Sequence, residues 1–298
     1  MPGPTVNHQK VALAAGLYLV ATPIGTARDI TLRALDILAS ADLLVAEDTR
    51  SLKHLMAIHG VPLGERQVWS YHDHSGEASR AGILAEIAAG RSVAYASEAG
   101  TPMVSDPGFD LARAVTAAEG LVTTAPGPSA AIAALTLAGQ PTDRFLFLGF
   151  LSPKSQARRS AVQEVGRVPA TLVLYESPKR IQALLGDLCA ELGEARPAAL
   201  CRELTKRFEE VVRGSLGDLR DQLAERTLKG ECVLVIGPPL PVEVTEEDMM
   251  MALQQELATG TVRDAAAAVA AQFDVPRKQA YQLALKMQAA LKDGEGAA

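Results

Sequence analysis

Hydrophobic residues along most of the chain form short apolar or β-branched runs, separated by longer stretches in which apolar and polar positions recur at helical spacing. Because strands and helices alternate in this way, the pattern predicts an α/β protein whose sheets are mainly parallel. The apolar runs predict eight strands, at residues 16–21, 43–46, 92–96, 121–124, 145–150, 171–175, 198–201 and 232–236.

Two residue pairs predict where helices begin. Asp106 precedes Pro107, and Ser177 precedes Pro178. Each pair places a capping side chain ahead of a proline at the first helical position, where the missing N–H of proline costs nothing.

Proline-rich segments predict the domain boundaries. Ala-Pro-Gly-Pro at 125–128 separates the strands into two groups, and Pro-Pro-Leu-Pro at 238–241 closes the second group. The sequence therefore predicts four parts: an N-terminal extension (1–15), an N-terminal α/β domain (16–127), a second α/β domain (128–240) and a helical tail (241–298).

The tail shows no strand pattern and predicts three helices. Thr245 with Asp248 and Thr261 with Asp264 resemble capping boxes, with aspartate in place of the usual glutamate. The turn at 273–276 predicts either a helix-turn-helix that binds nucleic acid or an ordinary helical hairpin. Basic residues near this turn are Arg263, Arg277, Lys278 and Lys286.

Composition restricts the partners and the compartment. The 298 residues carry a net charge of -6, so any contact with a nucleic acid must come from local charge. Cys189, Cys201 and Cys232 are too few and too widely spaced for a disulfide framework or a zinc site, and they predict core thiols in a reducing cytoplasm. No apolar run approaches the roughly 20 residues that cross a bilayer, so we expect no membrane segment.

Turns rich in glycine and proline follow four predicted strands, at residues 22–25, 46–50, 97–108 and 126–130. Open parallel sheets bind ligands at the carboxyl ends of their strands, so these turns predict a ligand site. The sequence contains no G-x-x-x-x-G-K-[ST] loop and no G-x-G-x-x-G fingerprint, which excludes a P-loop or Rossmann type of nucleotide binding.

Eight motifs between Leu17 and Ile236 together resemble the tetrapyrrole methylase superfamily and, within it, the ribosomal RNA small subunit methyltransferase I family. They are Val-Ala-Thr-Pro-Ile-Gly (20–25), Glu-Asp-Thr-Arg (47–50), the loop from Ser97 to Gly108, Pro-Gly-Pro-Ser (126–129), Gly-Phe-Leu (149–151), Tyr-Glu-Ser-Pro (175–178), Arg-Glu-Leu-Thr-Lys (202–206) and Lys-Gly-Glu (229–231).

The resemblance implies a cytoplasmic homodimer that holds S-adenosylmethionine in a cleft between two α/β domains. It also implies a substrate, the 2′-hydroxyl of a cytidine in the decoding region of 16S rRNA in the 30S subunit. Residues that would frame the cofactor by this resemblance are Pro23, Ser97, Glu98, Gly100, Met103, Val104, Ser129 and Ala130, with Tyr175, Cys201 and Glu231 from the second domain.

Methylation of a hydroxyl needs a group that accepts its proton. Candidate bases are Glu47, Asp48, His72, Glu176 and Glu203, of which we favour Asp48 and Glu176. Lys206 or Arg202 would stabilise negative charge on oxygen or orient a phosphate.

These residues also have purely structural interpretations. Asp48 or Thr49 would cap a helix, and Glu176 with Ser177 would start one. Arg202 and Glu203 would form an ion pair between the domains.

Two positions depart from the family pattern. Glu98 replaces the aspartate of the usual Ser-Asp-Ala-Gly-Thr-Pro loop, which moves the carboxylate one methylene outward. The segment around His72 and His74 also varies. This alternating pair has no obvious further ligands, so we interpret it as a polar loop and predict no metal.

Local positive charge between residues 152 and 180 predicts an RNA contact, although a solvated helix face would have the same composition. Six basic residues, Lys154, Arg158, Arg159, Arg167, Lys179 and Arg180, oppose Glu164 and Glu176.

Two other functions remain open at this point. A methylase of a corrinoid or porphyrin precursor would share the fold. A non-catalytic nucleic-acid-binding protein would use the tail to bind and the α/β body only to form dimers.

Overall fold

A computed structural model describes residues 7–72, 75–240, 245–258, 260–273 and 275–295. His74, one of the two histidines considered above, and Asp274, in the turn between the last two helices, lie outside these residues. The chain forms two compact units, Met1–Pro239 and Leu240–Ala298.

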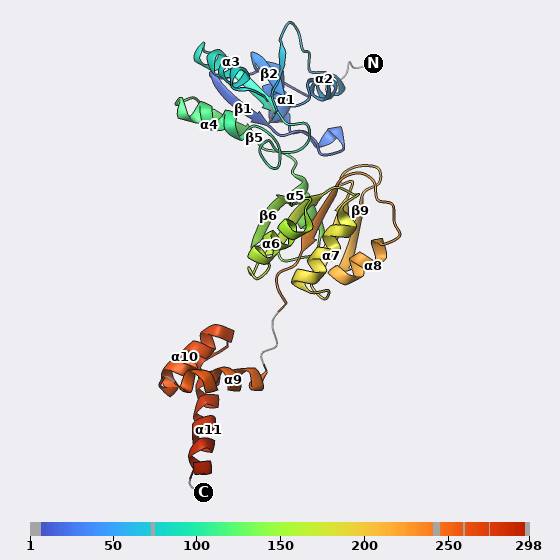
Figure 1. The fold of residues 1–298 in the computed structure, drawn as a ribbon. Helices are drawn as coiled ribbons and strands as arrows, with labels where there is room; N and C mark the ends of the chain where they lie inside the picture. The colour runs from blue at the N-terminus through green and yellow to red at the C-terminus, as the bar shows by residue number, and fades with distance from the viewer. Residues whose placement is uncertain (1–6, 73–74, 241–244, 259, 274, 296–298) are drawn as a thin grey trace. The chain divides into compact units, whose positions relative to one another are not determined.

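The first sheet, in the blue-to-green part of the ribbon in Figure 1, has five parallel strands in the order β3-β2-β4-β1-β5. Leu17 and Leu19 of β1 face one side and Tyr18 and Val20 face the other, as strand geometry requires. Helices α1 and α2 pack on the Tyr18 face and α3 and α4 on the Leu17 face, so the sheet is covered on both sides. The bounds are β1 (Gly16–Val20), β2 (Leu43–Ala46), β3 (Val68–Ser70), β4 (Ser92–Ala96), β5 (Val122–Ala125), the short 3-10 turn η1 (Ala27–Asp29), α1 (Leu32–Ser40), α2 (Thr49–Ile58), α3 (Glu77–Ala88) and α4 (Phe109–Ala117).

The second sheet is mixed, in the order β6-β7-β10-β8-β9. Helix α5 packs on one face, and α6, α7 and α8 cover the other. The bounds are α5 (Ala130–Leu137), β6 (Phe145–Phe150), α6 (Ser155–Val165), β7 (Thr171–Glu176), α7 (Ile181–Leu192), β8 (Pro197–Arg202), β9 (Glu210–Ser215), α8 (Leu216–Leu223) and β10 (Cys232–Ile236).

The prediction of mainly parallel sheets is wrong for this second sheet. Only β6 and β7 pair in parallel, whereas β10 runs antiparallel to β7 and β8, and β8 runs antiparallel to β9. The connection from β8 to β9 spans residues 203–209, which is too short for the crossover that parallel pairing needs.

All eight predicted strands form, and the structure adds β3 and β9. Both extra strands lie at sheet edges. Strand β3 has three residues, and β9 contains Glu210 and Arg213, so neither presents the apolar run that marks a buried strand.

Both predicted helix starts are wrong. Helix α4 begins at Phe109 after Gly108, whose φ of +123° favours glycine, because the loop before it continues through Pro107. Helix α7 begins at Ile181, because the Arg180 N–H bonds to the Ser177 carbonyl at 3.0 Å and closes a separate turn first.

The three predicted tail helices are confirmed as α9 (Glu246–Leu257), α10 (Val262–Phe273) and α11 (Arg277–Glu295). They enclose a small core that includes Leu253, Val269 and Leu283. The first capping box is present in full, with reciprocal hydrogen bonds between Thr245 and Asp248. At the second, the Asp264 N–H bonds to the Thr261 hydroxyl at 3.2 Å.

Cys189, Cys201 and Cys232 are buried and unpaired, which confirms the prediction of core thiols. Among the described helices, none combines the length and the apolar composition needed to cross a membrane.

The ion pair between Arg158 and Asp187 joins α6 to α7. Arg158 is only 4% exposed, and its Nε lies 2.7 Å from the Asp187 carboxylate. Removing one member of such a pair leaves the other charge desolvated and uncompensated.

We therefore expect Arg158→Ala to lower the free energy of unfolding by about 3 to 5 kcal/mol. Arg113→Ala, which breaks an exposed pair with Asp110, should change it by less than about 0.5 kcal/mol. Urea unfolding followed by circular dichroism measures both values. Equal shifts in the two variants would contradict this assignment.

Candidate active site

The first unit contains two α/β halves, one around each sheet. Four turns of the first half, which contains β1 to β5, meet at one edge of its sheet because they follow the parallel strands β1, β2, β4 and β5. Thr22 and Gly100 form a two-way backbone bridge, with N–O distances of 2.9 and 3.0 Å. The buried Ser97 hydroxyl donates to the Gly100 carbonyl at 2.7 Å, and the Thr101 hydroxyl donates to Pro128 O at 2.8 Å. These bonds fix the loop 97–108 against its neighbours.

The second α/β half contributes the opposite wall, from the ends of β6 and β7 and the start of β10. The Ala131 N–H donates to the Tyr175 hydroxyl at 3.0 Å, which places the ring at the start of α5. Burial raises the pKa of Tyr175, so its phenol stays protonated at neutral pH. Because a protonated phenol has no free base to accept a proton, the raised pKa excludes Tyr175 as the general base.

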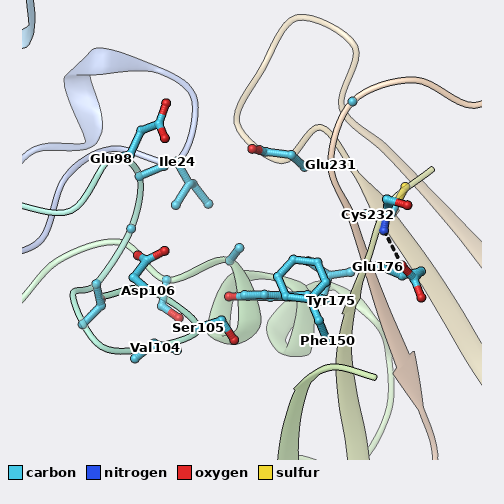
Figure 2. Close-up of a pocket in the computed structure, with 18 of the residues that line it drawn as sticks. Ile24, Glu98, Val104, Ser105, Asp106, Phe150, Tyr175, Glu176, Glu231 and Cys232 are labelled. Carbon is cyan, nitrogen blue, oxygen red and sulfur yellow. Dashed lines mark hydrogen bonds between the residues drawn. The ribbon is translucent and has the colours of Figure 1, made fainter. Parts of the chain in front are cut away.

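A cavity of about 440 Å³ lies between these two walls. Figure 2 shows Glu98, Val104 and Asp106 on one side and Tyr175 and Glu231 on the other. The described lining includes five carboxylates and no lysine, arginine or histidine. The carboxylates are Glu47, Glu98, Asp106, Glu176 and Glu231. The cavity therefore favours a cationic ligand over an anionic one.

The structure brings nine of the predicted site residues to this cavity. They are Glu47, Glu98, Gly100, Val104, Ser129, Ala130, Tyr175, Glu176 and Glu231. The remaining predicted residues, including the candidate bases His72 and Glu203, do not line the cavity. The others are Asp48, Arg202, Lys206, Pro23, Ser97, Met103 and Cys201.

Three of the predicted residues that do not line the cavity are Ser97, Met103 and Cys201, and the structure shows where each of them lies instead. Ser97 supports Gly100 from behind, as described above. Met103 is exposed and has a φ of +71°. Cys201 is fully buried against α5, where burial raises its pKa to about 11, so the thiol is protonated and unreactive at neutral pH.

Asp48 caps helix α2. Its carboxylate accepts the Arg50 N–H at 2.8 Å, and this bond lowers the pKa of Asp48. A carboxylate with a lowered pKa is a weaker proton acceptor, so the geometry favours the capping interpretation of this residue.

Glu176 is buried at the cavity wall, where one carboxylate oxygen accepts a hydrogen bond and the other faces a cation without accepting one from the described residues. Oε1 accepts the Ser177 N–H at 2.7 Å, and the Arg180 guanidinium lies 3.0 Å from Oε2. Arg180 also donates to the Leu151 carbonyl at 2.9 Å. The carboxylate is therefore kept in one orientation.

Arg202 pairs with Glu210 at 3.1 Å, so the expected ion pair with Glu203 is wrong. Their backbones are adjacent, but Glu203 has a φ of +53° and its carboxylate turns toward Lys206, at 3.1 Å. Lys206 also donates to Glu231, a cavity residue, at 2.7 Å.

The ionisation of this cluster follows from its hydrogen bonds. Burial lowers the pKa of Lys206, but its bonds to Glu231 and Glu203 outweigh burial and raise the pKa overall. Burial raises the pKa of Glu203, but the bonds from the Glu231 N–H and Lys206 lower it overall. Lys206 is therefore a fixed cation that orients Glu231, and it is not a base.

Sequence reasoning missed several lining residues. Asp106 stands in the loop 97–108, where the sequence singled it out only as a helix cap, and Phe150 stands in the motif 149–151 without any pattern of its own. Cys232 and Val233 belong to a predicted strand, but nothing in the sequence indicated that they contact a ligand. The full set is Ile24, Ala99, Thr101, Ser105, Asp106, Phe150, Ser177, Pro178, Gly230, Cys232 and Val233.

Residues 152–180 offer less positive charge than the number of their basic residues predicts, because helix α7 supplies acidic partners from outside that range. Arg158 pairs with Asp187, and Arg159 pairs with Glu191. Arg180 pairs with Glu176.

The sequence matches two family models. Residues 16–220 match Tetrapyrrole (Corrin/Porphyrin) Methylases, and residues 243–288 match the RsmI C-terminal HTH domain. Ribosomal RNA small subunit methyltransferase I of Mesorhizobium japonicum is 42% identical over 95% of this chain and 96% of its own length. The protein of that name from Escherichia coli O157:H7 is 39% identical over 95% of this chain and 99% of its own length.

Solved structures have the same fold at low identity. The methyltransferase CobJ gives a TM-score of 0.59 at 18% identity, covering 78% of this chain and 97% of its own. Uroporphyrin-III C-methyl transferase from Thermus thermophilus, complexed with S-adenyl homocysteine, gives 0.53 at 20% identity, covering 74% and 97%. These likenesses confirm the predicted fold class.

Extensive identity to the named relatives, together with the match of both family models, confirms the resemblance drawn from the motifs. The chain belongs to the ribosomal RNA small subunit methyltransferase I family of the tetrapyrrole methylases, and it is an S-adenosylmethionine-dependent methyltransferase.

Proposed function

We propose that this enzyme methylates the 2′-hydroxyl of a cytidine in the decoding region of 16S rRNA, within the 30S subunit. The observation that carries the proposal is identity of about two fifths, over almost the full length, to relatives named ribosomal RNA small subunit methyltransferase I. As the sequence predicts, we assign it to the cytoplasm as a homodimer.

The cavity fits the methyl donor. S-adenosylmethionine is a sulfonium cation, and it supplies the methyl group when it is bound. Glu98 and Glu231 face each other across the cavity and would attract that charge (Figure 2). Gly100, with a φ of +86°, and the small residues Ser129 and Ala130 leave the backbone accessible to the ligand.

The same carboxylates restrict how RNA enters. Phosphate groups would be repelled by the acidic lining, whereas a ribose hydroxyl carries no charge. A 2′-hydroxyl also exists only in RNA, which makes it a group by which RNA is distinguished from DNA. The cavity therefore suits a reaction in which the sugar enters and the flanking phosphates stay outside.

We assign proton removal to Glu176. Of the two bases favoured from the sequence, Glu176 lines the cavity and Asp48 does not. Ser177 N–H and Arg180 hold the Glu176 carboxylate in one orientation, which is the positioning that a proton acceptor needs.

The first prediction concerns the product. With labelled S-adenosylmethionine and 30S subunits from cells lacking the modification, we expect label on the ribose of one decoding-region cytidine, mapped by nuclease digestion and mass spectrometry. A matched incubation with uroporphyrinogen should give no labelled product. Label on the tetrapyrrole and none on 30S subunits or free rRNA would assign the alternative substrate.

A second prediction concerns Glu98. Glu98→Gln should weaken S-adenosylmethionine binding by about two- to five-fold, the range for an exposed ion pair, and leave S-adenosylhomocysteine binding unchanged because its thioether is neutral. Isothermal titration calorimetry measures both dissociation constants. Glu98→Asp keeps the charge and serves as the matched control. Equal weakening of both ligands by Glu98→Gln would show that the charge plays no part.

A third prediction separates the two candidate bases. Glu176→Gln should lower kcat by about 10²- to 10⁴-fold with little change in the S-adenosylmethionine Kd. Asp48→Asn should keep kcat near the wild-type value, because asparagine caps a helix as well as aspartate does. Single-turnover methylation of 30S subunits gives both rates. The reverse pattern would assign the proton acceptor to Asp48.

A further inference from the structure

Phe150 is an aromatic residue that the proposed reaction leaves unexplained. It lines the cavity and is 59% exposed, at the end of the edge strand β6. Figure 2 shows its ring next to Tyr175 at the cavity wall. The ring centroids of Phe150 and Tyr175 are 5.6 Å apart, in an edge-on arrangement.

A β-bulge places Phe150 there. Side chains alternate along a strand, so Phe147 and Phe150, three positions apart, should face opposite sides of the sheet. The pairing of β6 with β7 shifts register between Phe147 and Gly149, and both phenylalanines then contact Tyr175. Without the bulge, the Phe150 ring would point away from the cavity.

Gly149 makes the bulge possible. Its φ of +59° is a left-handed conformation, and a Cβ at this position would lie 2.9 Å from the Ser105 hydroxyl. Ser105 belongs to the cavity loop of the first α/β half, so Gly149 also permits the close approach of the two walls. The Gly-Phe-Leu motif therefore directs an exposed ring toward the site.

Two lysines stand on the segments that follow this ring and the neighbouring cavity residue Pro178. Lys154 follows β6 and Lys179 follows the cavity residue Pro178, and both are exposed. Among the described residues, no ion pair involves either lysine. The Arg180 bond to Leu151 O connects the two segments that carry them. The ring and the two lysines therefore belong to segments that meet at this end of the cavity.

We infer that Phe150 stacks on the base of the target nucleotide while Lys154 and Lys179 contact its flanking phosphates. The inference rests on the proposed function, and it adds how the substrate is held. Enzymes that act on a base extrude it from its stack, and a base unstacked in this way, like the bases of a single strand, stacks readily on an aromatic side chain. An exposed ring on segments that also carry exposed lysines fits a nucleotide, whose base is a flat π surface and whose phosphates are anionic.

The competing occupant is the adenine of the cofactor, which also presents a flat ring. The two assignments differ in what is measured. Stacking on the RNA base affects the KM for 30S subunits, whereas stacking on adenine affects the Kd for S-adenosylmethionine.

Phe150→Ala should lower kcat/KM for 30S subunits by about 5- to 150-fold, the range for loss of one base-stacking contact, and leave the cofactor Kd unchanged. Phe150→Trp should keep most of the wild-type value, and Phe150→Leu should behave as Phe150→Ala. Phe145→Ala, at the other end of β6 and outside the cavity lining, is the matched control.

Wild-type kcat/KM in Phe150→Ala, or a Kd for S-adenosylmethionine that rises by the factor lost in kcat/KM, would overturn the inference. Failure of the wild-type enzyme to methylate 30S subunits would instead reject the proposed function. The two failures are therefore distinguishable in one series of measurements.

The lysines are tested by salt dependence in the same series. Lys179→Ala should reduce the slope of log binding constant against log salt concentration by about one. Lys10→Ala, at an exposed lysine outside the cavity lining, should leave the slope unchanged. An unchanged slope in Lys179→Ala and in Lys154→Ala would show that neither lysine contacts a phosphate.

Discussion

The site depends on one close contact between the two α/β halves of the first unit. The turn at 22–26 meets the loop at 203–206, where the Thr26 N–H donates to the Thr205 hydroxyl at 3.1 Å. A Cβ on Gly25 would lie 2.4 Å from that same hydroxyl, so only glycine allows the approach. Glu203 and Thr205 both have positive φ, and this strained backbone is what brings Lys206 beneath Glu231. This contact, together with the close approach of Gly149 to Ser105, brings the cavity walls together, and it also positions the carboxylate of Glu231.

Five carboxylates in one cavity repel one another, and the structure offsets part of this repulsion from outside the cavity. Lys206 holds Glu231 and Glu203, and Arg180 holds Glu176. These cations stand behind the carboxylates instead of lining the cavity, so the negative potential inside is reduced only in part. That arrangement suits a cationic methyl donor, whose positive charge is lost when the methyl group leaves.

The sequence predicts the fold well for strands that are buried on one or both faces of a sheet. Buried strands such as β4 and β10 are continuous apolar runs, and glycine-rich turns follow the parallel strands, so both the strands and the site edge were predictable. The edge strands β3 and β9 were not, because a solvent-exposed edge imposes no apolar pattern. The start of α7 was missed because a hydrogen-bonded turn competes locally with the helix, and a proline is compatible with either.

Residue roles within the site were less predictable than the motifs, since a motif identifies a segment and the backbone decides which side chain faces the ligand. Glu47 and Asp48 are neighbours, yet one lines the cavity and the other caps a helix. Glu98 shows the same dependence. Its side chain is exposed at the cavity rim, so the extra methylene relative to the family's aspartate extends into solvent-accessible space and meets no packed wall. Because coulombic attraction falls slowly with distance, a longer acid at a rim position keeps its effect on a cation. The same change at the buried Glu176 would displace a carboxylate that is fixed by one hydrogen bond from Ser177 and an ion pair with Arg180.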